Sequence, residues 1–179
     1  MASGMSKKNW LIRITLITVV LALVGGALSC DSSLLSQKAP DFTLPTMTGD
    51  NITLSELEGT PVVINFWATS CTHCVAELPY FEAAAKSEVE VRVIATNVGQ
   101  PLSEVERFFG GYEPTMIVTL DETTEIFQTY SRDDNSRGYI PITFFIDSEG
   151  IVQFIKIGAF QSETELWDSL NDVFGITTP

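Results

Sequence analysis

The strongest constraint on the fold is an apolar run that leads directly into two closely spaced cysteines. Residues 61–68, Pro-Val-Val-Ile-Asn-Phe-Trp-Ala, are apolar almost throughout, which is typical of a strand buried on both faces of a parallel sheet. Cys71 and Cys74 follow this run. From there, apolar residues recur at the spacing of one helical face: Cys74, Leu78, Phe81 and Ala85. The sequence thus predicts a buried strand, a short loop and a helix that packs on the sheet.

Further strands are expected before and after this unit. Residues 41–44 and 51–54 flank a turn at Gly49-Asp50 and predict a small N-terminal hairpin. Four other strands are expected, at residues 89–95, 116–120, 142–146 and 151–157, the last two forming an antiparallel hairpin. The order of elements predicts an α/β fold with a mixed central β-sheet, helices on both faces and an added N-terminal β-hairpin.

Capping residues predict where the helices begin. The pattern Ser-x-x-Glu of a capping box occurs three times, at residues 55–58, 103–106 and 162–165. Asp121 is expected to start a helix over residues 122–130, and Ser70 to cap the helix that carries the cysteine pair.

The first thirty residues have the layout of an export signal. Lys7, Lys8 and Arg13 precede an apolar run over residues 14–28, which is shorter than the roughly 20 residues that cross a bilayer comfortably. Basic residues before such a run stay cytoplasmic, so the rest of the chain is expected to be exported.

Cys30 ends this segment. Residues 27–30, Ala-Leu-Ser-Cys, resemble a bacterial lipobox, although Ala27 stands where a leucine is usual. Three outcomes stay open: lipidation of Cys30 after cleavage, a retained transmembrane anchor in which Cys30 is an inert thiol, and free secretion. The predicted location is extracytoplasmic and membrane-anchored, in a bacterium.

The remainder of the chain is expected to be one acidic domain. Residues 31–38 are polar and rich in serine and predict a tether to a domain over residues 39–179. All 23 acidic residues but only 7 of the 10 basic ones lie from Asp31 onward, so this part carries 7 − 23 = −16 charges. Such a field repels phosphate backbones and anionic lipid headgroups, which argues against nucleic-acid partners.

A Cys-x-x-Cys motif at the start of a helix is suited to thiol–disulfide exchange. The first sulfur lies beside unpaired N–H groups at the positive end of the helix dipole, which favours a thiolate at Cys71. Cys74 would then be the resolving thiol. The alternatives are a zinc site, a structural disulfide and two inert core thiols. A zinc site needs four ligands, but outside the pair only Cys30 and His73 remain, and Cys30 belongs to the export segment. A disulfide that closes so short a loop adds little stability. We expect no metal and no cofactor besides the Cys71–Cys74 disulfide.

Two segments resemble the TlpA/ResA-like thioredoxins. Residues 65–79 (Asn-Phe-Trp-Ala-Thr-Ser-Cys-Thr-His-Cys-Val-Ala-Glu-Leu-Pro) are similar to their active-site segment. Residues 139–147 (Tyr-Ile-Pro-Ile-Thr-Phe-Phe-Ile-Asp) are similar to a second motif around a proline. The likeness covers about residues 39–174 and includes an insertion like that at residues 102–130. It implies a thioredoxin-like fold and thiol–disulfide oxidoreductase activity.

The resemblance also implies roles for three residues. The proline at the place of Pro141 is cis in this family and lies against the disulfide. The glutamate at the place of Glu77 is a buried acid that moves protons to and from the cysteines. Asn65 stands where ordinary thioredoxins have a buried aspartate, which makes Glu77 the better candidate for that task. A trans proline and a solvated helix glutamate are the alternatives.

Three further residues near the motif bear on redox tuning and on partners. His73, the sole histidine, would stabilise a Cys71 thiolate when protonated and make the disulfide more oxidising, unless it is a passive exposed residue. Trp67 matches the family and is equally explained by core packing. Ser70 replaces the tryptophan that is usual before the first cysteine.

These residues predict electron exchange between a membrane thiol donor, such as a CcdA/DsbD-like protein, and extracytoplasmic protein disulfides. Apocytochrome c is the expected example, because family members act in cytochrome c maturation. Oxidation of new thiols is the close alternative. A peroxiredoxin needs Pro-x-x-x-Thr-x-x-Cys. With Cys71 as its cysteine, Ile64 stands at the place of the proline and Ala68 at the place of the threonine. A copper-delivery protein needs a distant histidine, which this sequence lacks. A non-catalytic interaction module would leave the cysteine pair unexplained.

Overall fold

A computed structural model describes residues 33–132 and 138–178. The chain divides into two units, residues 1–31 and 32–179, and the described residues belong to the second. The predicted export segment, with Cys30, lies outside them. Among the helices of the described residues, none combines the length and the apolarity that a membrane crossing requires.

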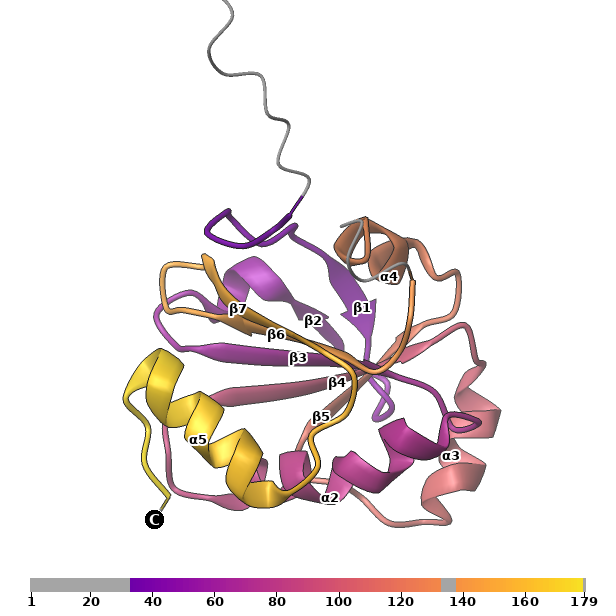
Figure 1. The fold of residues 1–179 in the computed structure, drawn as a ribbon. Helices are drawn as coiled ribbons and strands as arrows, with labels where there is room; N and C mark the ends of the chain where they lie inside the picture. Colours follow the sequence, from indigo (N-terminus) through magenta and orange to yellow (C-terminus); the bar gives the residue numbers. More distant parts are fainter. Residues whose placement is uncertain (1–32, 133–137, 179) are drawn as a thin grey trace, which may run out of the picture. The chain divides into compact units, whose positions relative to one another are not determined.

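A five-stranded mixed sheet forms the centre of this unit, with the order β5-β4-β3-β6-β7 (Figure 1). Strands β3, β4 and β5 are parallel, and β6 and β7 run antiparallel to their neighbours. The bounds are Val62–Trp67 for β3, Arg92–Val98 for β4, Ile117–Asp121 for β5, Ile142–Ile146 for β6 and Val152–Ile157 for β7. Every residue of β3 is buried, as its apolar run predicts. Strand β4 begins three residues later than expected, because its pairing with β3 starts at Arg92 opposite Val62.

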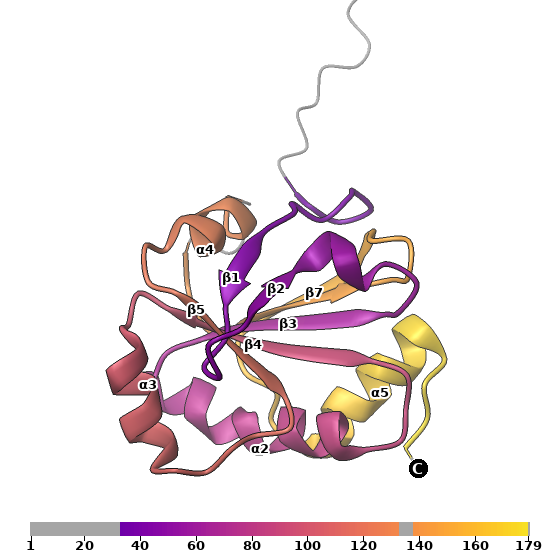
Figure 2. The ribbon, with the colours of Figure 1, turned by 180° about the vertical axis from the view of Figure 1, so that it is seen from behind.

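The two faces of the sheet carry different layers (Figures 1 and 2). Helices α2 (Thr72–Lys86), α3 (Leu102–Phe109) and α5 (Glu163–Phe174) pack on one face. The hairpin of β1 (Thr43–Pro45) and β2 (Asn51–Thr53), the 3₁₀ helix η1 (Leu54–Leu57) and α4 (Glu125–Tyr130) cover the other. This arrangement confirms the predicted fold class and the N-terminal hairpin.

Side chains of β3 alternate between two hydrophobic cores, because successive residues of a strand point to opposite faces. Val63 and Trp67 belong to the core under α2 and α5, whereas Ile64 and Phe66 belong to the core under the hairpin and α4. Asn65 lies between Val63 and Trp67 in this alternation and so points to the same face as they do. A polar side chain is therefore buried on the face that α2 covers.

Two of the three predicted capping boxes are wrong. Helix η1 begins at Leu54, and α3 begins at Leu102 after Pro101, neither with a side-chain cap. Leu54 is buried in the core, which fixes the start of η1 before Ser55. The backbone of Pro101 is already held near the φ that a helix start requires. The third box is confirmed, since Ser162 accepts a hydrogen bond from Glu165 N at the start of α5.

Helix α4 begins at Glu125, three residues later than predicted, after Thr124 in the left-handed region. Asp121 ends β5 instead of capping this helix directly. Its Oδ2 accepts a 2.7 Å hydrogen bond from Phe127 N, inside the helix. The carboxylate thus supports the first turn of α4 from the preceding strand.

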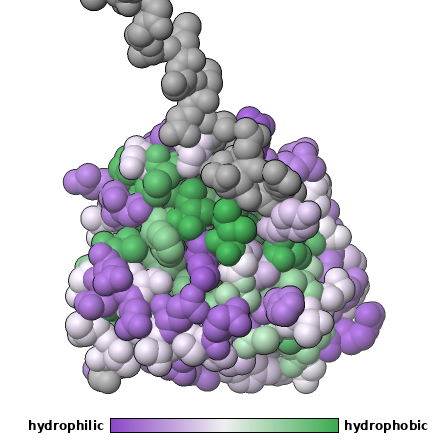
Figure 3. Space-filling model, viewed as in Figure 1, coloured by the Kyte–Doolittle hydropathy of each residue, from purple (hydrophilic) through white to green (hydrophobic). Residues whose placement is uncertain are grey.

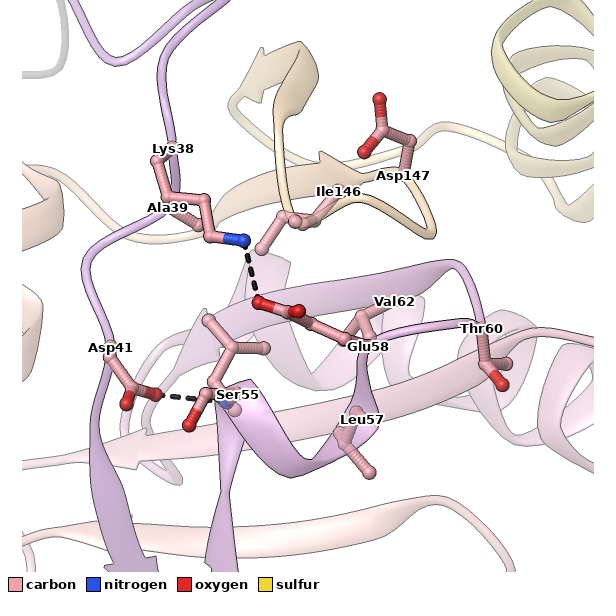
Figure 4. Close-up of a pocket in the computed structure, with 12 residues that line it drawn as sticks. Lys38, Ala39, Asp41, Ser55, Leu57, Glu58, Thr60, Val62, Ile146 and Asp147 are labelled. Atoms are coloured by element: carbon pink, nitrogen blue, oxygen red, sulfur yellow. Dashed lines mark hydrogen bonds and ion pairs between the residues drawn. The ribbon is translucent and has the colours of Figure 1, made fainter.

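The segment before β1 lies against the sheet where β3 begins. Ser36 N donates to Val152 O at 2.7 Å, and Lys38 pairs with Ile151. Figure 4 shows Lys38 reaching across a small pocket to Glu58, with 2.6 Å between Nζ and Oε1. Part of the segment predicted as a tether, residues 36–38, therefore contacts the domain.

Candidate active site

The cysteine pair lies where β3 gives way to α2. Strand β3 ends at Trp67, and Cys71 is the N-cap residue of α2, with extended backbone angles. Its Sγ accepts a 3.2 Å hydrogen bond from Cys74 N. The predicted cap, Ser70, is wrong by one residue, because the sulfur itself takes the position from which an N-cap side chain reaches the first free N–H groups.

The two cysteines differ in access. They are joined by a disulfide, with 5.2 Å between their Cα atoms. Cys71 is half-buried, whereas Cys74 is fully buried in the core beneath α2. A partner can therefore reach the first sulfur but not the second.

A loop from the opposite side of the sheet borders Cys71. Its Sγ lies 3.9 Å from the carbonyl oxygen of Ile140, and the Ile140–Pro141 peptide bond is cis, as the resemblance implies. Pro141 is buried, while Tyr139 is 66% exposed. The exposed backbone next to Cys71 thus lies at residues 139–140.

Glu77 is fully buried on the same face of α2 as Cys74, one turn further along the helix. Asn65 Nδ2 donates to its Oε1 at 2.8 Å, and Phe160 N donates to its Oε2 at 2.7 Å. Burial raises the pKa of Glu77 from its usual 4.5 to about 7, although both hydrogen bonds act in the opposite direction. This carboxyl group can therefore gain and lose a proton near neutral pH.

Asn65 connects Glu77 to a residue that the sequence analysis did not single out. Its Nδ2 also donates to Thr143 Oγ1, at 3.0 Å, and both side chains are fully buried. Asn65 and Thr143 face each other in the β3–β6 pairing. The sequence signal that could have identified Thr143 is its hydroxyl side chain, two residues after Pro141.

Trp67 and His73 lie close to the cysteine pair in sequence, but neither side chain forms a described hydrogen bond with it. Trp67 is fully buried, 5.2 Å from the ring of Phe108 and 5.9 Å from that of Phe109 between centroids. His73 is exposed in the first turn of α2. Within the described residues, no hydrogen bond joins either ring to Cys71.

A polar network that was not predicted holds the loop before Cys71. Thr69 N donates to Gln100 Oε1 at 2.8 Å, and Asn97 Nδ2 donates to the same oxygen at 3.0 Å. Glu104 accepts from Thr69 Oγ1 at 3.1 Å and from Gln100 Nε2. Gln100, in the loop between β4 and α3, thus holds the backbone that leads into the cysteine pair, and Asn97 of β4 and Glu104 of α3 position the Gln100 side chain.

Comparison with known proteins places this site in a family. The family model described as the AhpC/TSA family matches residues 35–155. The thiol–disulfide oxidoreductase ResA of Geobacillus kaustophilus is 30% identical over 168 residues, covering 89% of this chain and 94% of that protein. The chain belongs to the ResA-like thiol–disulfide oxidoreductases of the AhpC/TSA family.

Other relatives agree with this placement. ResA of Bacillus subtilis is 33% identical over 135 residues, or 74% of this ResA-like chain and 72% of that protein. A solved candidate protein disulfide isomerase from Bacteroides thetaiotaomicron is 27% identical, with a TM-score of 0.68, covering 79% of this chain and 91% of that one. The ResA-like chain is therefore a thioredoxin-fold enzyme that acts on protein thiols and disulfides.

The structure bears on two other site types. Ile64 and Ala68, at the places of the proline and threonine of a peroxidatic motif, are buried apolar residues. Within the part of the chain that the structure describes, no three metal-ligating side chains come together. The geometry at Cys71 and Cys74 is that of a disulfide exchange site.

Proposed function

We propose that this ResA-like protein reduces disulfides of extracytoplasmic proteins, with Cys71 as the attacking sulfur and Cys74 as the resolving one. The observation that carries the proposal is the unequal environment of the two cysteines. Cys71 is accessible and receives an N–H hydrogen bond at the start of α2, which favours its thiolate form. Cys74 is buried one turn before a buried acid.

The proposed reaction has two exchange steps. The Cys71 thiolate attacks a substrate disulfide, forms a mixed disulfide and releases one substrate sulfur as a thiolate. Cys74 then loses its proton and attacks Cys71 Sγ, which breaks the mixed disulfide and releases the second substrate sulfur. Two electrons pass to the substrate, and the Cys71–Cys74 disulfide is formed.

Glu77 is the proposed proton acceptor for Cys74. A buried thiol cannot give its proton to bulk water directly, and a carboxylate with a pKa of about 7 is matched to a base that works at neutral pH. Asn65 holds this carboxylate by its amide. In the reverse direction Glu77 returns the proton to Cys74.

The loop at Pro141 is the proposed site for the substrate backbone. The carbonyl of Ile140 lies beside Cys71, and Tyr139 is exposed next to it. An extended substrate segment can form backbone hydrogen bonds here while its disulfide faces Cys71. Trp67 supports the site through core packing.

The described residues do not show the histidine contact on which the oxidant alternative depends. That reading depends on His73 stabilising the Cys71 thiolate, and the exposed His73 makes no hydrogen bond to Cys71. We therefore propose the reductant direction. The proposed location is outside the cytoplasm, with residues 1–30 as export signal and with Cys30 lipidated or the apolar segment retained. The proposed electron donor is a CcdA/DsbD-like membrane protein, and apocytochrome c is a proposed substrate.

Equilibration of residues 31–179 with glutathione buffers tests the direction. A reduction potential near −270 mV, like that of thioredoxin, supports a reductant, whereas about −120 mV, like that of DsbA, contradicts it. The variant Cys74→Ser should accumulate mixed disulfides with its substrates through Cys71. The double variant Cys71→Ser/Cys74→Ser is the control, and equal capture by both would contradict the mechanism.

A further inference from the structure

A row of polar side chains crosses the sheet from Glu77 to the surface. Asn65 on β3 faces Thr143 on β6, and Thr143 faces Lys156 on β7. Residues paired in this way project from the same face of a sheet. The row therefore lies on the face that α2 and α5 cover, and it ends at Lys156, whose side chain is 26% exposed.

A second route leads from Glu77 to the same place. Phe160 N donates to Glu77, and the ring of Phe160 lies under the Lys156 ammonium, 5.4 Å from Nζ. Lys156 Nζ is in turn 2.6 Å from Glu165 Oε1 on α5. Glu165 Oε2 accepts from Gln161 N, next to Phe160. The strand and the loop after it both bring this ion pair close to the buried acid.

The ion pair is partly shielded from water. Glu165 is 35% exposed in its side chain, and the pair lies where β7 meets the start of α5. On the face shown in Figure 3, apolar surface over β6 and β7 borders the hydrophilic surface of α5. Charges in such a position are screened less than fully exposed ones.

We propose that Lys156 and Glu165 are positioning residues for the proton step: they act on Glu77 in opposite directions and so set the pH at which it accepts the proton of Cys74. The proposal rests on the proposed function of Glu77. Neither residue touches the cysteines or a substrate. Each acts through Glu77.

The elements packed around Glu77 offer few other charges. Strand β3 contributes the amide of Asn65, β6 the hydroxyl of Thr143, and the loop after β7 the N–H of Phe160. Helix α2 itself contributes Cys74, whose sulfur is joined to Cys71. The charged groups that act on Glu77 are Lys156, which lowers its pKa, and Glu165, which raises it, both by less than burial does.

A pH profile separates this role from a structural one. The test forms a mixed disulfide between Cys71 and a chromogenic aromatic thiol and follows release of that thiol as Cys74 attacks. The release rate should rise with pH through the pKa of Glu77. Lys156→Gln should move the midpoint of this profile up by about half a pH unit, and Glu165→Gln should move it down by a similar amount. If the ion pair served only as a structural contact, its loss would change the midpoint in the same direction in both variants.

The chain offers a matched control. Lys38 forms an ion pair of equal length with Glu58, at the start of β3, away from the cysteines. Lys38→Gln should leave the midpoint unchanged. Thermal unfolding of all variants shows that they are folded, and only a shift of opposite sign in the Lys156 and Glu165 variants supports the inference.

Three results distinguish failure of the proposed function, of the role of Glu77 and of the role of the ion pair. If the wild type releases no aromatic thiol at any pH, the proposed function fails. If it does so with a profile that Glu77→Gln leaves unchanged, the role of Glu77 fails and the inference with it. If Glu77→Gln removes the profile but neither ion-pair variant moves the midpoint, or both move it the same way, the proposed function stands and the inference is wrong.

Discussion

Two glutamates on one helix show how differently a fold can treat the same side chain. Glu77 faces the sheet from α2 and is fully buried, with two hydrogen-bond donors. Glu82, five residues on, faces the segment between α3 and β5 and accepts from Thr115 N, Met116 N and Tyr112 OH, with Lys86 Nζ at 3.1 Å. Burial raises the pKa of Glu77 to about 7, whereas the hydrogen bonds of Glu82 outweigh its burial and lower its pKa to about 2.

The difference separates a proton carrier from a structural anchor. A carboxyl group that is charged throughout the useful pH range can hold the start of β5 against α2, but it cannot exchange protons near pH 7. Glu77 has fewer hydrogen-bond donors than Glu82, so its protonated and ionised forms are close to equal in free energy near pH 7. Four measurements test whether the two carboxylates differ in this way.

The largest effect is expected on the rate of mixed-disulfide resolution. Glu77→Gln removes the proton acceptor for Cys74 and should slow release of an aromatic thiol from Cys71 by about 10²- to 10⁴-fold at pH 7. Glu82→Gln should change this rate by less than about twofold. Equal losses in the two variants would show that proton transfer does not distinguish the two carboxylates.

The second effect is on stability as a function of pH. The folded pKa of Glu77 lies above its usual 4.5, so the folded protein holds the proton more tightly than the unfolded chain. Its stabilising contribution is complete below about pH 4.5 and is lost as pH rises through about 7. This difference amounts to at most about 3 kcal/mol of unfolding free energy. Urea unfolding of oxidised wild type and Glu77→Gln across this range measures it, and parallel curves would contradict it.

Glu82 should show the opposite dependence. Its folded pKa lies below its usual 4.5, so its contribution is present above about pH 4.5 and is lost as pH falls toward about 2. Glu82→Gln leaves donors from Thr115, Met116 and Tyr112 short of acceptors and should cost about 2 kcal/mol at pH 7. The exposed Glu106 on α3 provides a control, since Glu106→Gln should cost almost nothing.

The smallest effect is expected from one donor to Glu82. Tyr112→Phe removes a 2.7 Å hydrogen bond and should lower the unfolding free energy by about 0.5–1 kcal/mol. It should leave the release of aromatic thiol from Cys71 unchanged. Tyr139→Phe is the matched control for stability, because within the described residues the exposed Tyr139 hydroxyl has no hydrogen bond. A loss above about 2 kcal/mol would mean that Tyr112 does more than donate to Glu82.

The contrast also shows what the sequence could reveal. The buried strand and the cysteines at its end follow from local patterns of apolar residues at known spacing, whereas the burial of Glu77 was implied by the family resemblance. The start of α5 was predictable because Ser162 and Glu165 act within one turn. These features need no knowledge of which strands pair.

Features that depend on pairing were out of reach. Thr143 and Lys156 belong to one row only because the β6–β7 register sets them opposite each other. Glu104 lies inside the capping box predicted at residues 103–106, where it had no role, but its side chain contacts Thr69 and Gln100. Cys71 displaced Ser70 as the cap because the sulfur already reaches Cys74 N. In each case a long-range or competing contact decided between local options of similar energy.

The anchoring of residues 36–39 at one end of the sheet has a mechanical consequence. Their contacts with Val152, Ile151 and Glu58 lie beside the first residue of β3, whereas Cys71 follows its last. A strand of this length separates the two by roughly 17 Å before the loop is added. Tension applied through the N-terminal segment would load these contacts first and leave the reactive end of the domain unstrained. The sulfur pair and the contacts that hold the start of the domain therefore lie beyond opposite ends of β3.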